Sequence, residues 1–303
     1  MPDLAIVYEH PSWFEPLFAA LGRGGVEFVA VPVGDHRFDP QGSPPPAPVI
    51  LNRVAMSSFL REAEHPLLYT AALLDHWRRL GARVLNGPEV MALDSSKARQ
   101  LSLLASLGLA MPRTRVVHRA ADVGEAADAI GFPLLVKANV GGSGAGIARF
   151  GDAAELAAAL AGGSIPQSID RVLLVQEEVP ARGGAIWRLE TLAGRFLYAL
   201  EVAGAGQFDL CPADACAADR GPIPMRAFDP PPEIVAAAER IAAAMGMDVG
   251  GVEVMVDERD GVARFYDINA LSNFVAKPLE VLGYDPHDRL VDYLKQQIAE
   301  ARA

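Results

Sequence analysis

The stretch VEVMVDERDGVARFYDIN, residues 252–269, has the pattern of two strands joined by a tight turn. Valine recurs at every second position from residue 252 to residue 256, which puts the valines on one face of a strand and Glu253 on the other. The Asp-Gly pair at 260–261 is a strong signal for the turn of a hairpin. The pattern therefore predicts a β-hairpin.

Oxygen-bearing side chains gather at one end of this hairpin. The alternation would put Phe265, Asp267 and Asn269 on one face of the second strand. With a connection of two to four residues, Glu253 would lie opposite one of residues 266–268. Two carboxylates and an amide oxygen suit Mg²⁺ and leave positions open for phosphate oxygens. A solvated outer face of an edge hairpin explains this stretch equally well when it is taken alone.

Composition narrows the class of protein. The chain has 303 residues, 51% of them hydrophobic, which is enough for two or three compact lobes. Its net charge of −11 argues against a general nucleic-acid or anionic-membrane binder. No apolar run reaches the length of about 18 residues that a membrane span needs, and the start lacks a secretory pattern. Two cysteines do not make a disulfide framework. We expect a cytoplasmic protein.

The first part of the chain predicts an open α/β sheet. Strands are expected at 4–8, 26–31 and 48–53, with a helix between the first two. The third strand ends at Arg53, and strand carboxyl ends in such sheets face the ligand crevice. Arg53 is therefore a candidate contact for an anion, although an ordinary surface arginine fits the same observation.

Two lysines and a glycine-rich segment follow. Lys97 lies in the first turn of a helix, where the helix dipole already favours phosphate, although a solvated lysine is an equal alternative. Lys137 lies near the end of a predicted strand and is followed by GGSGAG, residues 141–146. The residues after these glycines do not fit a P-loop. They predict a returning strand, so that the loop acts as a flap over phosphates or as a plain flexible hairpin.

The middle of the chain offers further polar side chains. A predicted strand ends in Glu177 and Glu178, which suit contacts with adenine or ribose or a simple exposed position. Arg188 lies on the first of two later strands. Cys211 and Cys216 have a C-x4-C spacing that is not usual for zinc, so core or loop cysteines are favoured over a metal or redox pair.

Taken in order, these features resemble the ATP-grasp superfamily. The chain is most similar to the branch that contains glutathione synthetase, D-alanine–D-alanine ligase and the glutamate ligase that modifies a ribosomal protein. The resemblance covers nearly the whole chain. It implies an α/β and α+β fold: an N-terminal open α/β domain at 1–94, a central lobe with the flap at 95–180, and a C-terminal lobe with the metal site at 181–303. ATP would be held between the two α+β lobes.

The resemblance also implies roles for single residues. Lys97 and Lys137 would contact the nucleotide phosphates, and the glycine flap would close over them. Arg188, with Lys137, would steady the transferred phosphoryl group and the acyl-phosphate that follows. The implied nucleotide contacts are Lys97, Lys137, Gly141, Gly142, Ser143, Gly144, Gly146, Glu177, Glu178 and Val179, and the implied metal ligands are Glu253, Asp267 and Asn269.

The sequence departs from the relatives near the expected acceptor substrate. Ile186 replaces the acid often used for the ribose, and Glu201-Val202 with the segment 208–212 replaces basic and asparagine residues. The loop 269–273, NALSN, replaces a Ser-Pro-Gly-like loop. The candidate substrate contacts are Arg53, Asp209 and Asn273.

The resemblance implies an ATP- and Mg²⁺-dependent ligase, with Mn²⁺ as a substitute metal. It would join a carboxylate to an amine or thiol through an acyl-phosphate and release ADP. The expected partners are small-molecule or peptide carboxylate and amine substrates, with no nucleic acid and no membrane; a homodimer is left open. The alternatives are a small-molecule kinase that uses the same ATP site and a nucleotide-binding regulator with altered catalysis.

Overall fold

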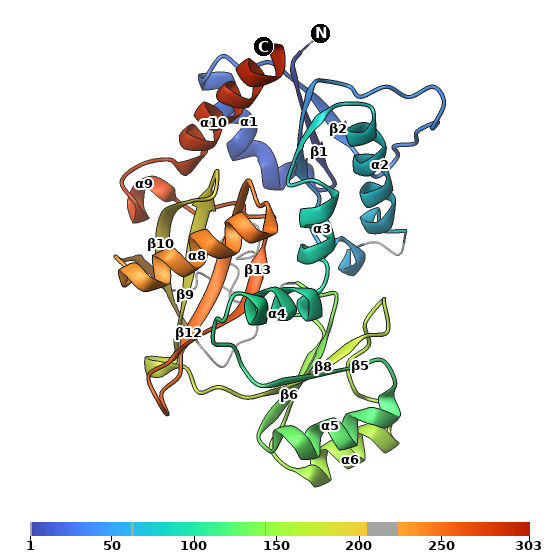
Figure 1. Ribbon diagram of the computed structural model, residues 1–303, viewed down its shortest axis with the longest axis vertical. Helices are drawn as coiled ribbons and strands as arrows, with labels where there is room; N and C mark the ends of the chain where they lie inside the picture. The colour runs from blue at the N-terminus through green and yellow to red at the C-terminus, as the bar shows by residue number, and fades with distance from the viewer. Residues whose placement is uncertain (1, 62–63, 143, 205–223) are drawn as a thin grey trace.

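Three sheets follow one another along the long axis of the molecule (Figure 1). The computed structural model describes residues 2–61, 64–142, 144–204 and 224–303. Each sheet is accompanied by helices, so the predicted combination of α/β and α+β architecture is confirmed. No helix in these ranges is long and apolar enough to cross a membrane.

The first sheet is parallel and open, as the sequence predicts. Its strand order is β2-β1-β3-β4, and β1 and β3 are buried along their whole length. Central strands of a parallel sheet are covered on both faces, which explains their continuous apolar runs. The register pairs Tyr8 with Arg53 at the carboxyl edge. The elements are β1 (Leu4–Tyr8), α1 (Glu15–Arg23), β2 (Phe28–Pro32), β3 (Val49–Arg53), α2 (Leu67–Arg79) and β4 (Arg83–Leu85), with 3-10 turns at Pro11–Phe14 and Ser58–Leu60.

The second sheet carries the glycine-rich segment. Its strand order is β5-β8-β6-β7, and β7 runs antiparallel to β6, which confirms the predicted returning strand. Helices α5 and α6 lie at the lower end of Figure 1 beside this sheet. Its elements are β5 (Thr114–Val117), α5 (Val123–Ile130), β6 (Leu134–Ala138), β7 (Ile147–Phe150), α6 (Ala153–Ala161) and β8 (Leu173–Glu177).

Two helices connect the first and second sheets. Helix α4 (Lys97–Ser106) begins where predicted, because the Ser96 hydroxyl accepts a hydrogen bond from the Arg99 amide at 3.3 Å. Helix α3 (Pro88–Asp94) is not among the predicted elements. Proline at the first helical position, preceded by Gly87, is the signal that would have predicted it.

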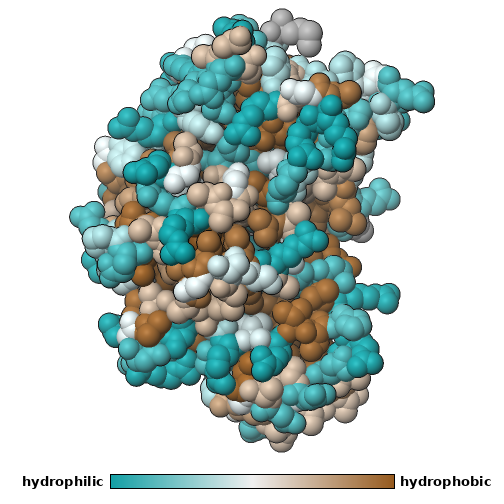
Figure 2. Space-filling model, viewed as in Figure 1, coloured by the Kyte–Doolittle hydropathy of each residue, from teal (hydrophilic) through white to brown (hydrophobic). Residues whose placement is uncertain are grey.

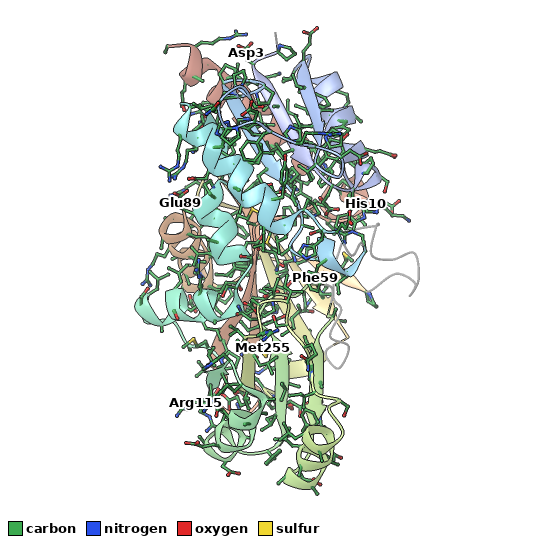
Figure 3. The ribbon with its side chains drawn as sticks, turned by 90° about the vertical axis from the view of Figure 1, so that its right-hand side faces the viewer. Asp3, His10, Phe59, Glu89, Arg115 and Met255 are labelled. Atoms are coloured by element: carbon green, nitrogen blue, oxygen red, sulfur yellow. The ribbon has the colours of Figure 1, made fainter. Side chains whose placement is uncertain are left out.

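The third sheet holds the hairpin. Its strand order is β11-β10-β9-β12-β13, and α8 packs on one face through an apolar stripe that ends at Gly246 in the left-handed region (φ 70°). In the side view of Figure 3, Met255 of β12 lies between Phe59 of the first part of the chain and Arg115 of β5. The elements are β9 (Ala185–Leu192), β10 (Arg195–Ala203), β11 (Met225–Ala227), α8 (Pro232–Met245), β12 (Val249–Val256), β13 (Ala263–Asn269), α9 (Pro278–Val281) and α10 (Pro286–Arg302).

The hairpin forms with one difference from the prediction. Glu253 pairs with Asp267, but Val254 pairs with Phe265, so Tyr266 is the extra residue of a β-bulge. Phe265 is consequently 2% exposed in the core under α8 and does not share the face of Asp267. The expectation that Phe265 faces the same way as Asp267 and Asn269 is wrong, because strict alternation does not survive a bulge.

The last helix returns to the first sheet. In Figure 1, α10 (red) lies beside α1 (blue), with the two chain ends close together. Arg23 of α1 bonds to Asp285 at 2.7 Å and to Asp288 at 2.8 Å. Arg302 pairs with Asp3 at the other end of the helix.

The face of the molecule in Figure 2 is mostly hydrophilic, with separate brown patches across the middle of the view.

Asn86 joins the first sheet to the third. Its side-chain amide donates to the carbonyls of Val249 (2.6 Å) and Ala270 (2.8 Å) and accepts from the amides of Asp248 (2.8 Å) and Val249 (3.3 Å). The residue is buried and has a φ of 48°, a conformation that asparagine tolerates better than most residues. Asn86 therefore fixes the start of β12 and the residue after β13 at once.

Asn86→Gly should lower the free energy of unfolding by about 3 kcal/mol or more, because it keeps the backbone conformation but leaves several buried groups unpaired. Urea unfolding would measure the change. Ala193→Gly, at φ 52° in the turn between β9 and β10, is the matched control and should be neutral or slightly stabilising. Equal unfolding midpoints for Asn86→Gly and the unmodified protein would show that these hydrogen bonds contribute little.

Candidate active site

The hairpin, helix α4 and strand β9 bring a compact set of charges together. Lys97 of α4 pairs with Asp267 of β13. Arg188 of β9 donates from Nη1 to Glu253 Oε1 at 2.9 Å. Asn269 lies beside both acids, with Nδ2 at 3.4 Å from Glu253 Oε1 and 3.3 Å from Asp267 Oδ2. The sequence-predicted metal ligands and two of the predicted cations are therefore neighbours.

The donor set fits a hard divalent cation. Glu253 and Asp267 are directly paired across β12 and β13, and burial together with the charge of Asp267 raises the pKa of Glu253. Two like charges held this close favour a cation between them. Among the described residues, no three His, Cys, Asp or Glu side chains come together to hold a metal, so the set depends on the Asn269 amide as its third donor.

The bulge at Tyr266 adds a side chain to this face. Its hydroxyl donates to Glu253 Oε2 at 2.8 Å. The ring lies beneath Lys137, with Nζ 5.8 Å from the ring centroid. Tyr266 therefore orients one predicted ligand and packs under one predicted phosphate contact, a role that the sequence pattern does not reveal.

The two lysines differ in charge environment. Burial opposes the charge of Lys97, but Asp267, Glu253 and Asp94 together raise its pKa. Burial, with the nearby charge of Lys97, lowers the pKa of Lys137 to about 8. Lys137 Nζ donates to Gln176 Oε1 at 2.6 Å, which holds it on the sheet that carries the glycine loop. Lys97 therefore stays cationic at neutral pH, whereas the pKa of Lys137 lies just above neutral pH.

Arg188 is fixed between two acids. Its Nε donates to Glu190 Oε1 at 2.7 Å, opposite the bond from Nη1 to Glu253. Burial opposes the charge, but Glu190 and Glu253 raise the pKa of Arg188 further above its usual range. Gly251 on the neighbouring strand makes room for this pair, because a Cβ there would lie 2.8 Å from Glu190 Oε1 and 2.9 Å from Arg188 Nη2.

The glycine loop lies against the first part of the chain. A Cβ at Gly142 would come within 2.9 Å of Ser57 Cβ, and one at Gly141 would lie 4.0 Å from Lys97 Cε. Gly144 and Gly146 have φ values of 70° and 71°, which other residues rarely adopt. Ser143 lies outside the described residues. The loop thus needs its glycines for close approach and for backbone conformation.

The predicted adenine segment lies at the end of β8. Both oxygens of Glu177 are engaged: Oε1 accepts from the Arg113 amide at 2.8 Å, and Oε2 from Arg259 Nη2 at 3.2 Å. Glu178 is paired with Arg149 at 2.8 Å. Val179 follows them at the crossing from the second sheet to the third. The backbone amides of Glu177 and Glu178 are engaged as well, by the carbonyls of Arg113 (2.9 Å) and Pro133 (3.2 Å). Adenine contacts at this segment remain a prediction.

Two of the three predicted substrate contacts, Arg53 and Asn273, lie within the described residues. Arg53 is 2% exposed; its Nη2 donates to the Ser272 carbonyl and lies 3.4 Å from Asn273 Oδ1. Arg53 and Asn273 are therefore neighbours, as the prediction of a shared substrate region requires. Asp209, Cys211 and Cys216 lie outside the described residues. Ile186, in the position of the missing ribose acid, is buried among core residues.

Three further acidic or polar residues near the site are not predicted from the sequence. Glu190 shares a strand face with Arg188 two positions earlier, and this spacing is a readable signal. Asp94 ends the unanticipated α3, and burial raises its pKa to about 7. Tyr266 depends on the bulge, which no pattern in the sequence marks.

Comparison of the sequence with known proteins finds similarity over a short stretch. No model of a protein family matches the sequence. A stretch of 68 residues is 46% identical to D-alanine–D-alanine ligase from Stutzerimonas stutzeri (strain A1501) and spans 22% of this chain and 22% of that ligase. The sequence match thus reaches about a fifth of the relative's length.

Similarity to solved structures extends over nearly the whole chain. The ATP-grasp ligase PsnB, complexed with a minimal precursor, has a TM-score of 0.70 and 18% identity, covering 98% of this chain and 100% of PsnB. A RimK domain protein ATP-grasp from Sphaerobacter thermophilus DSM 20745 gives 0.69 and 18%, covering 96% and 99%. D-alanine–D-alanine ligase from Bacillus anthracis, complexed with ATP, gives 0.69 and 15%, covering 99% and 97%. The chain has the ATP-grasp fold, and the resemblance read from the sequence is confirmed for the fold.

Gly251→Ala should destabilise the protein by about 1–3 kcal/mol, because its Cβ would push apart the buried Arg188–Glu190 pair. Gly124→Ala in α5 is the matched control, since a Cβ there meets nothing within 4 Å and alanine favours the helix. Thermal unfolding of both variants tests the difference. Equal melting temperatures would mean that the pair shifts without cost.

The pKa of Lys137 should rise when its charged neighbour is removed by Lys97→Met. In the unmodified protein the folded state releases this proton near pH 8 and the unfolded state near 10.5, so the contribution of Lys137 makes the fold more stable as pH rises through that window. NMR of ¹³C-labelled lysine would follow the titration. Lys295→Met, on exposed α10, should leave it unchanged, and an unshifted pKa in Lys97→Met would contradict the assigned cause.

Proposed function

We propose that this protein is an ATP- and Mg²⁺-dependent ligase that joins a carboxylate to an amine, or to a thiol, and releases ADP. The observation that carries the proposal is the convergence of Lys97, Lys137 and Arg188 on the Glu253, Asp267 and Asn269 set. These charges suit a nucleotide phosphate chain with its metal. The solved structures with the same fold include ligases in complex with ATP, or with Mg and ADP.

The proposed reaction assigns a role to each charged group of the site. Glu253, Asp267 and Asn269 would hold Mg²⁺, which supplies charge neutralisation for the β- and γ-phosphates. Lys97 and Lys137 would bind phosphate oxygens, and the loop 141–146 would exclude water above them. Arg188 would bind the transferred phosphoryl group, first on the γ-phosphate and then on the acyl-phosphate. The substrate carboxylate takes up the γ-phosphoryl group as its bond to ADP breaks. The amine then attacks the acyl carbon, phosphate leaves, and the amine gives up a proton as the amide forms.

The dual engagement of Arg188 explains why its position suits this role. Glu253 and Glu190 hold the guanidinium from two sides, so it needs no reorganisation to meet the developing charge. The Tyr266 hydroxyl meets the carboxylate of Glu253, which is a proposed metal ligand and not a free base. This arrangement favours direct transfer to the substrate carboxylate. The lobes 95–180 and 181–303 would close on the nucleotide between them, with 1–94 contributing to the acceptor side.

Asp267→Ala and Asn269→Ala should each lower ATP-dependent ADP release by about a hundredfold or more, because they remove metal donors. Mass spectrometry after incubation with ATP, Mg²⁺ and a cell metabolite extract would identify the product. Electron paramagnetic resonance of Mn²⁺ would report metal binding independently of turnover. Asp292→Ala, on the exposed face of α10, is the control and should retain both ADP release and Mn²⁺ binding.

Each result separates the possible functions. An amide or thioester product with stoichiometric ADP supports a ligase. A stable phosphorylated product without a second substrate would support the kinase alternative. Nucleotide and Mn²⁺ binding without turnover would support a regulator. Unchanged ADP release in Asp267→Ala would refute the metal assignment.

A further inference from the structure

The strand that carries two of the proposed metal ligands is an edge strand. Strand β13 stands last in its sheet, so within the described part of the chain only β12 pairs with it. Asp267 and Asn269 belong to this strand, and Ile268 lies between them. Ile268 is 1% exposed, so bulk water does not satisfy its outward-facing backbone groups. These groups need partners from another part of the protein.

The side chain of Gln100 supplies these partners. Its Oε1 accepts a hydrogen bond from the Ile268 amide at 3.0 Å, and its Nε2 donates to the Ile268 carbonyl at 2.9 Å. A facing residue of an antiparallel strand would make the same pair of bonds. Gln100 belongs to helix α4 and is 1% exposed, so its carboxamide takes the place of one residue of a further strand.

The two bonds fix the peptide planes on both sides of Ile268. The Ile268 amide belongs to the plane shared with Asp267, and the Ile268 carbonyl belongs to the plane shared with Asn269. Fixing both planes fixes the direction in which each ligand leaves the backbone. Mg²⁺ demands nearly ideal octahedral geometry, so its affinity depends on how accurately the donors are placed.

Asp94 supports the next position of the same edge. Its Oδ1 accepts from the Ala270 amide at 3.1 Å, and its backbone carbonyl accepts from Gln100 Nε2 at 3.2 Å. Gln100 and Asp94 therefore form one hydrogen-bonded unit along residues 268–270. Asn269 lies between the two backbone positions that this unit holds.

Helix α4 brings a side-chain contact and a backbone contact to the same strand. Lys97 and Gln100 are three residues apart and lie on one face of the helix. Lys97 pairs with the carboxylate of Asp267, while Gln100 holds the backbone beside it. The start of the helix is anchored in turn, because the Ala98 amide donates to Asn139 Oδ1 at 2.8 Å. The metal strand is thus held from the side of α4, where no further strand supports it within the described residues.

Resting on the metal site proposed above, we propose that Gln100 is a positioning residue for Asp267 and Asn269. Gln100 acts through the backbone of Ile268 and is not itself a ligand. It holds the edge strand so that the Asp267 carboxylate and the Asn269 amide meet the same cation. The donors then keep their spacing before the cation arrives, which removes the cost of arranging them on binding.

Electron paramagnetic resonance of Mn²⁺, titrated with a non-hydrolysable ATP analogue present, tests this role. Gln100→Met keeps a side chain of similar length and removes both bonds to Ile268. Its Mn²⁺ affinity should fall about tenfold or more, as when other residues that orient metal ligands are lost. The spectrum of the Mn²⁺ that still binds should also change, because the donors no longer have the same geometry.

Gln297→Met is the matched control. Gln297 is 7% exposed, and its carboxamide also makes two side-chain hydrogen bonds, with Arg83 Nε at 3.1 Å and Glu300 Oε2 at 2.7 Å. Both variants lose a buried carboxamide, so both should melt at a lower temperature. Only Gln100→Met should change the Mn²⁺ affinity and spectrum, and circular dichroism confirms that both variants are folded.

Asp267→Ala separates this inference from the proposed function. Weak Mn²⁺ binding in Asp267→Ala, with unchanged affinity and spectrum in Gln100→Met, would overturn the positioning role and leave the metal assignment in place. Equal losses of affinity in Gln100→Met and Gln297→Met would overturn it as well.

Two further outcomes concern the proposed function. Unchanged Mn²⁺ binding in Asp267→Ala would refute the metal assignment and the positioning role with it. The expected change in Gln100→Met, without ADP release by the unmodified protein, would instead support the positioning role and refute the ligase.

Discussion

The position of Arg188 between Glu253 and Glu190 is the constraint on which the rest of the site depends. A guanidinium that is 6% exposed requires compensation for its lost hydration, and two carboxylates on adjacent strands supply it. This requirement explains Gly251, because any side chain there would occupy the space of the ion pair. It also fixes the register of β12 against β9, in which Glu253 lies directly opposite Arg188.

The same arrangement links the proposed metal ligands to Arg53, a candidate substrate contact. Glu253 serves Arg188 and lies against Asp267, while Glu190 serves Arg188 and influences Arg53. A change in charge at one end therefore alters the electrostatic energy of the other charges, because they lie close together in a medium of low polarity. Catalysis and substrate choice would thus depend on a shared set of buried charges.

Much of this could be read from the sequence. Alternating valines, the Asp-Gly turn and the glycine loop predicted the hairpin and the returning strand, because those signals act locally. Ordered motifs predicted the neighbours Lys97, Asp267 and Asn269. Helix α3 is not predicted, although Pro88 after Gly87 is a local signal for its start. The bulge at Tyr266 is not predicted either, since packing against distant elements decides it. Burial of Arg53 and Glu190 likewise depends on contacts between sheets that a single sequence does not reveal.

Helix α10 has a consequence for movement within the molecule. Helix α10 follows the third sheet in the chain and pairs with the first part through Arg23 and Asp3. The first and third sheets are therefore tied together twice, through Asn86 and through α10. The second sheet is joined to the rest through two neighbouring connections, held side by side where the Glu177 amide bonds to the Arg113 carbonyl at 2.9 Å, and through separate contacts such as that of Arg259 with Glu177 at 3.2 Å. A rotation of the second sheet against the other two would therefore turn about this pair of connections and would have to break the contact of Arg259 with Glu177.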